Sequence, residues 1–268
     1  MSGALKLDTE RMIARKDGAI GWMVFNNPVR HNALSLDMWR AAATVIEAFQ
    51  TDDQIRVAIM TGAGDKAFVS GADISEFETQ RASAEAEKEY GRVTARAMAA
   101  LAAFDRPLIA MIRGYCMGGG LAMALNADIR IAAEGAKFAI PASRLGVGYG
   151  FSGLKILTDL VGPAMAKEIL FSSRRLSDSE ALRIGLVNRV VPPEVLEEEV
   201  RDLAETIAGN APLTIQAAKA AVGEVLKDPD RRDLAKIEAM VRACFDSADY
   251  TEGRRAFMEK RKPVFQGR

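Results

Sequence analysis

The sequence predicts an α/β protein of stacked ββα turns, followed by a C-terminal region that contains only helices. Apolar residues recur at strand spacing in 11–15 and 19–25, and then at helical spacing in 36–50. The order of strand and then helix returns along the first two thirds of the chain. From Pro193 onward the apolar residues keep helical spacing alone. We therefore divide the chain into a core, 1–192, and a helical region, 193–268.

The first unit is predicted to be a β-hairpin followed by a helix. Lys16-Asp17-Gly18 joins its two strands, because Asp-Gly supplies the turn geometry that hairpins favour. Ser35 is a suitable N-cap for the helix at 36–50, since its hydroxyl can accept a hydrogen bond from an amide of the first turn. A buried strand at 56–60 is expected next, closed by the glycine-rich segment 61–64.

Two further units are predicted before the helical region. They comprise a long helix at 82–104, a strand at 108–112, a short helix at 119–126 and a strand at 127–132. The helical region is predicted to hold helices at 194–208, 212–226, 231–247 and 250–261. Their apolar stripes need a covering surface, which we expect to be the core and a neighbouring subunit.

Composition and charge argue against several classes of protein. Lys plus Arg and Asp plus Glu number 36 each, so no overall field would attract nucleic acid or an anionic membrane. The longest apolar run, 97–104, is far too short to cross a bilayer, and we expect a cytoplasmic protein. Two distant cysteines and the single His31 give little support for a disulfide framework or a metal site.

Two glycine-bearing loops carry the strongest functional signal. The first, 68–74, reads Phe-Val-Ser-Gly-Ala-Asp-Ile, and the second, 114–122, reads Gly-Tyr-Cys-Met-Gly-Gly-Gly-Leu-Ala. Glycine lets a ligand approach the backbone, and the start of a helix leaves N–H groups unpaired. Each loop can therefore direct one backbone N–H at a developing oxyanion. Alone, the triple glycine would indicate only a tight turn.

Several short motifs, in their order and spacing, resemble the crotonase superfamily, the enoyl-CoA hydratase/isomerase family, over nearly the whole chain. The motifs are Asn32-Ala33-Leu34, 70–74, 118–120, 127–130, Leu145-Gly146, 180–188 and 259–263. The resemblance implies a ClpP-like spiral of ββα turns, a C-terminal helical trimerisation region, and trimers that can pair into hexamers. It also implies an acyl-CoA thioester substrate, with coenzyme A as part of that substrate and no separate cofactor. By position, Ala72 and Gly119 would supply the amides of the oxyanion hole.

The sequence departs from the family pattern where its hydratases carry two glutamates. These positions hold Ala122 and Ala142, and neither side chain can move a proton. Tyr149 lies in the next loop, where its phenol could donate a hydrogen bond or act as a general acid. Weaker candidates are Ser143 and Ser152 for positioning water, Glu76 and Glu78 for proton transfer, and Arg144 for pairing with a substrate carboxylate; Asp128 and Glu134 are expected to be solvated or paired.

Basic residues beside the motifs are candidate contacts for the phosphates of coenzyme A. Within the subunit these are Arg30 and Lys66, and the resemblance adds the backbone at Ala33 and Ala72. Lys260, in the C-terminal tail, would reach the site of a neighbouring subunit. His31 is expected at the surface, and Cys116 is expected to be a small buried hydrophobe, because no histidine lies in its motif.

Three interpretations remain open within this fold. The chain can be a family hydratase, a member that catalyses isomerisation, thioester hydrolysis or decarboxylation, or an acyl-CoA binder without catalysis. A fourth interpretation rests on 148–153, which matches the dinucleotide pattern GxGxxG. It is disfavoured because a proline-broken loop, and not a clean strand, precedes the motif.

Overall fold

The computed structural model describes residues 5–73 and 84–268 and confirms the predicted order of ββα turns. The predicted candidates Glu76 and Glu78, and the side chain of Ser152, lie outside the described part. The successive turns are β1 (Met12–Asp17), β2 (Ile20–Phe25) and α1 (Leu36–Thr51); β3 (Val57–Gly62), β4 (Ala67–Val69) and α3 (Ala84–Ala103); β5 (Leu108–Ile112), β6 (Tyr115–Met117) and α4 (Gly119–Leu125); and β7 (Ile129–Ala133), β8 (Lys137–Ala139) and α5 (Ala142–Leu145).

Successive turns contribute their strands to two sheets. The larger sheet has the order β1-β2-β3-β5-β7-β10, with β10 at Arg189–Val191, and all neighbours from β2 onward are parallel. The smaller sheet has the order β4-β6-β8-β9, with β9 at Leu176–Ser177. Because β4, β6 and β8 run parallel, their carboxyl ends meet at one edge. The two glycine loops and Pro141 leave the small sheet at that edge.

Helices cover both faces of the larger sheet. On one face α1 packs against α3 and the sheet, and the Ser35 hydroxyl caps α1 by accepting from the Met38 amide at 3.3 Å. On the other face α8 (Leu196–Ala208) buries Leu196, Val200 and Ala204 against the strands. By its packing, α8 therefore belongs with the sheet, although its sequence position places it in the predicted helical region.

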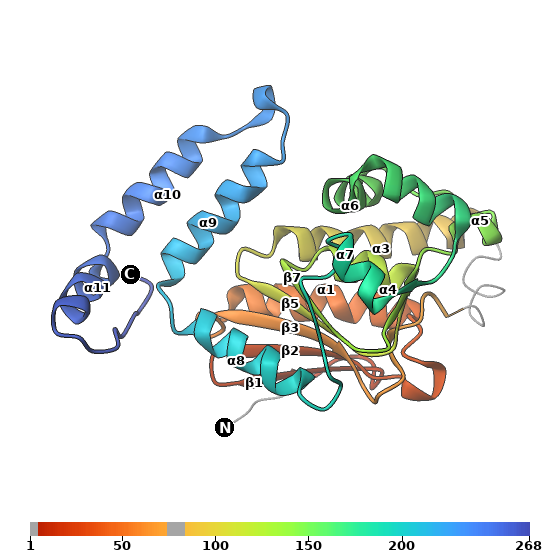
Figure 1. Cartoon of the computed structure of the whole chain (residues 1–268), viewed down its shortest axis with the longest axis horizontal. Coiled ribbons are helices and arrows are strands. Elements are labelled where there is room, and N and C mark those ends of the chain that lie inside the picture. The colour runs from red at the N-terminus through yellow and green to blue at the C-terminus, as the bar shows by residue number, and fades with distance from the viewer. Residues whose placement is uncertain (1–4, 74–83) are drawn as a thin grey trace.

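The remaining C-terminal helices form an arm that projects from the core (Figure 1). The arm contains α9 (Pro212–Val225), α10 (Leu234–Asp246) and α11 (Ala248–Met258), and α10 packs against α9. These bounds agree with the predicted helices to within a few residues. Large apolar side chains of the arm are exposed, among them Phe245 and Phe257.

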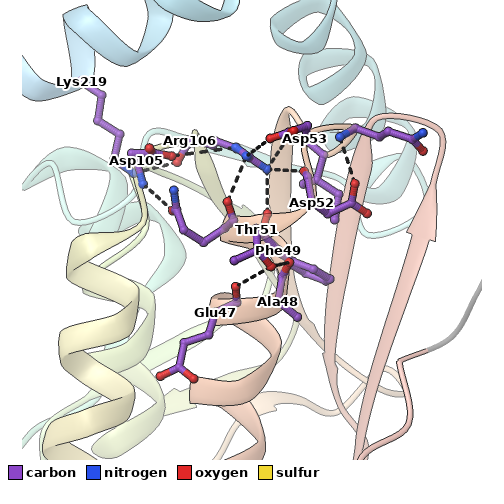
Figure 2. A network of polar contacts seen from close by, with 12 residues as sticks. Glu47, Ala48, Phe49, Thr51, Asp52, Asp53, Asp105, Arg106 and Lys219 are labelled. Atoms are coloured by element: carbon purple, nitrogen blue, oxygen red, sulfur yellow. Dashed lines mark hydrogen bonds and ion pairs between the residues drawn. The ribbon is translucent and has the colours of Figure 1, made fainter.

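Polar contacts anchor the arm near the end of α1 (Figure 2). Arg106 donates to the carbonyl oxygens of Phe49 at 2.7 Å and Gln50 at 3.0 Å, which the end of α1 leaves open, and to that of Ile55 in the following loop at 2.7 Å. From α9, Lys219 donates at 2.8 Å to the Arg106 carbonyl and to the Asp128 carboxylate. Asp128 also accepts from the Leu108 amide at 2.7 Å, which confirms that this carboxylate is paired.

A long helix, α6 (Phe151–Ser172), was missed from the sequence. Gly162 interrupts the helix with a positive φ of 76°, and Pro163 follows it. In sequence these two residues indicate the end of a helix, whereas in the structure they mark a kink within one. A shorter helix, α7 (Asp178–Arg183), follows β9 and carries a capping box between Ser177 and Glu180. In the described ranges, no helix combines the length and apolarity needed to cross a membrane.

Candidate active site

A cavity of about 340 Å³ lies at the carboxyl edge of the small sheet. Five residues singled out in the sequence share its wall: Ala72, Gly119, Ala122, Ala142 and Tyr149. They come from the loop after β4, the start and first turn of α4, the start of α5 and the loop before α6. Segments that lie far apart in the sequence therefore surround one space.

The loop after β4 is fixed by the segment that precedes α1. The Leu34 amide donates to the Gly71 carbonyl at 2.8 Å, and the Asp73 amide donates to the Leu34 carbonyl at 2.9 Å. These two bonds involve the residues on either side of Ala72, and neither involves the amide of Ala72 itself. Within residues 5–73 and 84–268, the Ala72 N–H has no hydrogen-bond partner.

The second loop supplies a comparable donor at the start of α4. The Gly118 amide donates to the Ala139 carbonyl at 2.8 Å, and Gly118 has a φ of 49° and a ψ of −116°. The Gly119 N–H lies in the first turn of the helix, where no intrahelical acceptor exists, and it too is unpaired in the described part of the chain. A Cβ added to Gly118 would lie 3.8 Å from the Gly71 Cα, so the two loops are neighbours.

The triple glycine has more specific causes than the close approach of a ligand. Gly118 needs glycine for its backbone angles. A Cβ on Gly119 would lie 3.2 Å from Cζ2 of Trp39, and one on Gly120 would lie 2.5 Å from the carbonyl oxygen of Val69. The absence of a side chain at Gly120 therefore allows α4 to pack directly against β4. The run therefore sets the position of the helix that presents the Gly119 amide.

The part of the cavity wall where the resemblance leads us to expect two glutamates is apolar or phenolic. Ala122 and Ala142 face the cavity, and the lining residues include no carboxylate, imidazole, ammonium or guanidinium among the described residues. Its ionisable side chains are Tyr90 and Tyr149. Burial, and to a lesser degree the charge of Tyr90, raises the pKa of the Tyr149 phenol. Tyr149 is therefore protonated at neutral pH and can donate a proton or a hydrogen bond.

The structure gives other roles to several weaker candidates. The Ser143 hydroxyl lies 2.6 Å from the Ser173 hydroxyl and 3.2 Å from the Phe171 carbonyl, so it joins α5 to the end of α6 and is absent from the cavity wall. Arg144 is exposed and also does not line the cavity. Burial raises the pKa of the Cys116 thiol, which confirms the prediction of an unreactive buried side chain.

The predicted contacts for coenzyme A fall in three places. Arg30 pairs with the buried Asp73 at 3.0 Å and lies in the same segment as Ala33, close to the Ala72 loop. Lys66 borders a separate surface hollow, which the exposed His31 also lines. Lys260 follows α11, and α11 lies at the opposite end of the molecule from α5 (Figure 1). Helix α5 contributes Ala142 to the cavity wall. Within one subunit, the structure therefore groups Arg30 and Ala33 with Ala72 and separates Lys260 from them.

Cavity residues on two helices were missed from the sequence. Trp39 of α1 and Tyr90, Thr94 and Met98 of α3 all line the cavity. Tyr90, Thr94 and Met98 recur every four residues and so share one face of α3. Periodicity could have identified this face, but it does not distinguish a cavity wall from solid core.

The segment 148–153 lacks the setting of a dinucleotide-binding loop. Helix α5 precedes it, and α6 begins within it at Phe151. The strands on either side, β8 and β9, pair antiparallel, whereas a βαβ unit joins parallel strands. This topology removes the basis for a nicotinamide-dependent oxidoreductase.

Comparisons with known proteins agree with this architecture over almost the entire chain. The family model described as enoyl-CoA hydratase/isomerase matches residues 15–268. A crotonyl-CoA hydratase from Syntrophomonas wolfei is 38% identical over 96% of this chain and 98% of its own length. A carnitinyl-CoA dehydratase from Salmonella typhi is 34% identical over 97% of this chain and 100% of its own.

A solved structure gives the same result for the fold. An enoyl-CoA hydratase/carnithine racemase from Magnetospirillum magneticum has a TM-score of 0.90 and 40% sequence identity, with 97% of each chain covered. The crotonase fold predicted from the motifs is thereby confirmed. The chain belongs to the enoyl-CoA hydratase/isomerase family and is an acyl-CoA thioester-processing protein of that family.

Proposed function

We propose that the cavity binds an acyl-CoA thioester with the carbonyl oxygen between the amides of Ala72 and Gly119. The observation that carries this proposal is that two N–H groups without partners, from neighbouring loops, line one cavity. Negative charge develops on the thioester oxygen when an enolate forms, and fixed donors stabilise that state more than the ground state. Loss of one such donor commonly costs about 3 kcal/mol of transition-state stabilisation.

Tyr149 is the proposed proton donor to the enolate. Its phenol lines the same cavity, and its raised pKa keeps the proton on the oxygen at neutral pH. The relatives named crotonyl-CoA hydratase and carnitinyl-CoA dehydratase favour hydration of an enoyl-CoA, or the reverse reaction, as the reaction class. With alanine at positions 122 and 142, activation of water is weak, and we expect slow hydration of crotonyl-CoA.

Decarboxylation is the second candidate, favoured by an acid without a matching base in the described cavity wall. An acyl group with a carboxylate on its α-carbon loses CO₂ without a protein base. The electron pair of the broken C–C bond passes to the thioester oxygen, where the two amides stabilise it. Tyr149 then protonates the α-carbon and regains a proton from water.

The arm supports a proposed trimer or hexamer. An apolar hollow of about 730 Å³ lies among α9, α10 and α11 and is bordered by Phe245, Phe257 and Phe265. A neighbouring subunit that covers it would also receive Lys260 close to its own coenzyme A site. Light scattering coupled to gel filtration would measure the assembly, and a monomer would contradict this part of the proposal.

The carbonyl site is tested by infrared spectroscopy of bound butyryl-CoA labelled with ¹³C at the thioester carbonyl. Two hydrogen bonds polarise that carbonyl, so its stretching frequency should fall on binding. Gly119→Pro removes one donor at the first helical position, where proline is allowed, and should reduce the shift. Its Cβ would lie 3.2 Å from Cζ2 of Trp39, so Gly119→Ala, which adds the same Cβ and keeps the N–H, is the control and should keep the shift. Bound butyryl-CoA with an unshifted carbonyl would contradict the proposal. Turnover of crotonyl-CoA and of malonyl-CoA then separates the two reaction classes.

A further inference from the structure

Two residues of the cavity wall are also exposed at the molecular surface. Leu145 ends α5 and is 58% exposed, and Val147, in the loop that follows, is 40% exposed. Both line the same cavity as Ala72 and Gly119. A side chain that borders a cavity and is also open to solvent lies where the cavity opens. The cavity therefore has an apolar opening between α5 and α6.

The apolar surface continues beyond this opening. Phe151, the first residue of α6, is 82% exposed and directly follows Gly150, which lines the cavity. Leu145, Val147 and Phe151 are thus three large, exposed apolar side chains that lie close together in the sequence. Single exposed apolar side chains are common, whereas a group of them beside a cavity is typical of a surface that binds an apolar ligand.

The cavity is longer than a four-carbon acyl group. Its wall on α3 includes Tyr90, Thr94 and Met98, and the step from residue 90 to residue 98 is about 12 Å along a helix axis. The three C–C bonds of a butyryl group, of about 1.5 Å each, cover less than half of that length. The Thr94 hydroxyl donates to the carbonyl oxygens of Tyr90 and Gly91 at 3.0 Å each, so its hydrogen-bonding capacity is used within α3. This wall can therefore accept a longer, apolar chain.

The opening lies where the acyl chain of the proposed substrate would emerge. The proposed contacts of coenzyme A, Arg30 and Ala33, lie in the segment that is hydrogen-bonded to the Ala72 loop. Leu145 and Val147 come from α5 and the loop before α6, which form another side of the cavity. The two substituents of a thioester carbonyl point in different directions, so a coenzyme beside the Ala72 loop directs the acyl chain toward other parts of the wall.

We propose that acyl groups longer than butyryl extend through this opening and bind with their terminal methylene groups to Leu145, Val147 and Phe151. The substrate class is an acyl-CoA thioester with an apolar chain of more than four carbons, and the two exposed wall residues set the preference for its length. This inference rests on the proposed function, because it assumes that the thioester oxygen lies between Ala72 and Gly119.

The test compares butyryl-CoA with octanoyl-CoA, which differ by four methylene groups. Burial of one methylene group tightens binding by about fourfold, so partial burial of four should lower the Kd by at least about tenfold. Isothermal titration calorimetry gives the ratio of the two Kd values. Leu145→Ser together with Val147→Ser should reduce this ratio to about threefold or less. Leu182→Ser is the matched control and should keep the ratio, because Leu182 is 44% exposed in α7 and is absent from the described cavity wall.

Two results would overturn the inference. One is a similar Kd for both thioesters in the unaltered protein; the other is a double variant that keeps the ratio of the unaltered protein. The second result, together with a changed assembly in light scattering, would assign the apolar surface to a neighbouring subunit. An intact infrared shift with equal Kd values would reject this inference alone, whereas loss of the infrared shift would reject the proposed function itself.

A second measurement decides if the double variant does not fold. In protein with ¹³C-labelled leucine methyl groups, the conservative Leu145→Ile assigns the Leu145 signals. Octanoyl-CoA should move these signals further than butyryl-CoA does. Equal movement with both thioesters would overturn the inference.

Discussion

Two walls of the cavity differ in the kind of group that they present, main-chain amides in one and side chains in the other. The proposed donor wall, formed by Ala72 and Gly119, presents backbone amides held by the small sheet and by the contact of α4 with β4. The proposed acid–base wall, formed by Ala122, Ala142 and Tyr149, presents side chains alone. Most substitutions leave a backbone amide in place, whereas a single substitution can remove the functional group of a side chain.

This difference explains how binding and proton transfer can diverge within one fold. The donor wall depends on strand order, on glycines and on the Leu34 bridge, all of which the fold itself requires. The proposed acid–base wall carries no such structural requirement, because the side chains of Ala122 and Ala142 line the cavity. A member of the family can therefore keep recognition of the thioester while its reaction changes.

Introduction of two carboxylates should have the largest effect. Ala122→Glu together with Ala142→Glu would place two ionisable groups beside the donor wall, where general acid–base catalysis is commonly worth about 10²–10⁴ in rate. We expect hydration of crotonyl-CoA, followed by loss of the enoyl thioester absorbance, to rise at least about 100-fold. Ala103→Glu, on the exposed face of α3, is the control and should leave the rate unchanged. A folded double variant as slow as the parent would show that the donor wall is not placed for this reaction.

Removal of the Tyr149 hydroxyl should have the next largest effect. Tyr149→Phe keeps the ring in the wall and deletes the proton donor, so kcat should fall by about 100-fold, with little change in the Kd for butyryl-CoA. In the parent, the rate should stay level through neutral pH and fall only above the ordinary phenol pKa of about 10, because burial raises the pKa of Tyr149. A pH–rate profile of both proteins checks this. An unchanged kcat would remove Tyr149 from the mechanism.

A methyl group on Gly120 should disturb the donor wall through packing alone. In Gly120→Ala the new Cβ would lie 2.5 Å from the Val69 carbonyl oxygen, so α4 must shift away from β4. Overpacking of this kind costs about 1–3 kcal/mol, which urea unfolding at constant m-value would measure. Gly91→Ala is the control: its Cβ meets nothing within 4 Å in α3, and it should stabilise the protein by about 0.5–1 kcal/mol. Equal stabilities for both variants would contradict the packing account.

Much of the fold could be predicted because its long elements have clear periods and caps. The hairpin was predicted with its turn one residue early, since Asp17 pairs with Ile20 and the turn is Gly18-Ala19. The Ser35 cap was predicted in place. The strands β4, β6 and β8 could not be, because each has only three residues and its partners come from other turns of the spiral. Helix α6 was missed because Gly162 and Pro163 mark a kink that looks like a terminus in sequence.

The sequence predicted the site residues that lie in the two glycine loops and in the loop before α6. It did not predict the cavity residues on the helices α1 and α3. Ala72, Gly119 and Tyr149 were chosen from the sequence, and the structure places them around one cavity. Trp39 was not chosen, because an apolar residue on the buried face of α1 looks like any other core residue. Its unpaired N–H becomes visible only when the neighbouring atoms are known.

The smallest predicted effect concerns the support of the acid–base wall. Ser143→Ala removes hydrogen bonds to the Ser173 hydroxyl and the Phe171 carbonyl, and should cost about 1 kcal/mol of unfolding free energy. The catalytic rate should stay the same, because the hydroxyl joins α5 to α6 and is outside the cavity wall. Thr44→Ala is the control: its hydroxyl donates to the Arg40 carbonyl on the exposed face of its own helix, α1, so its loss should change stability by a few tenths of a kcal/mol. Urea unfolding and steady-state kinetics of both variants make the measurement. A fall in kcat with unchanged stability for Ser143→Ala would return this hydroxyl to the reaction and extend the acid–base wall beyond Tyr149.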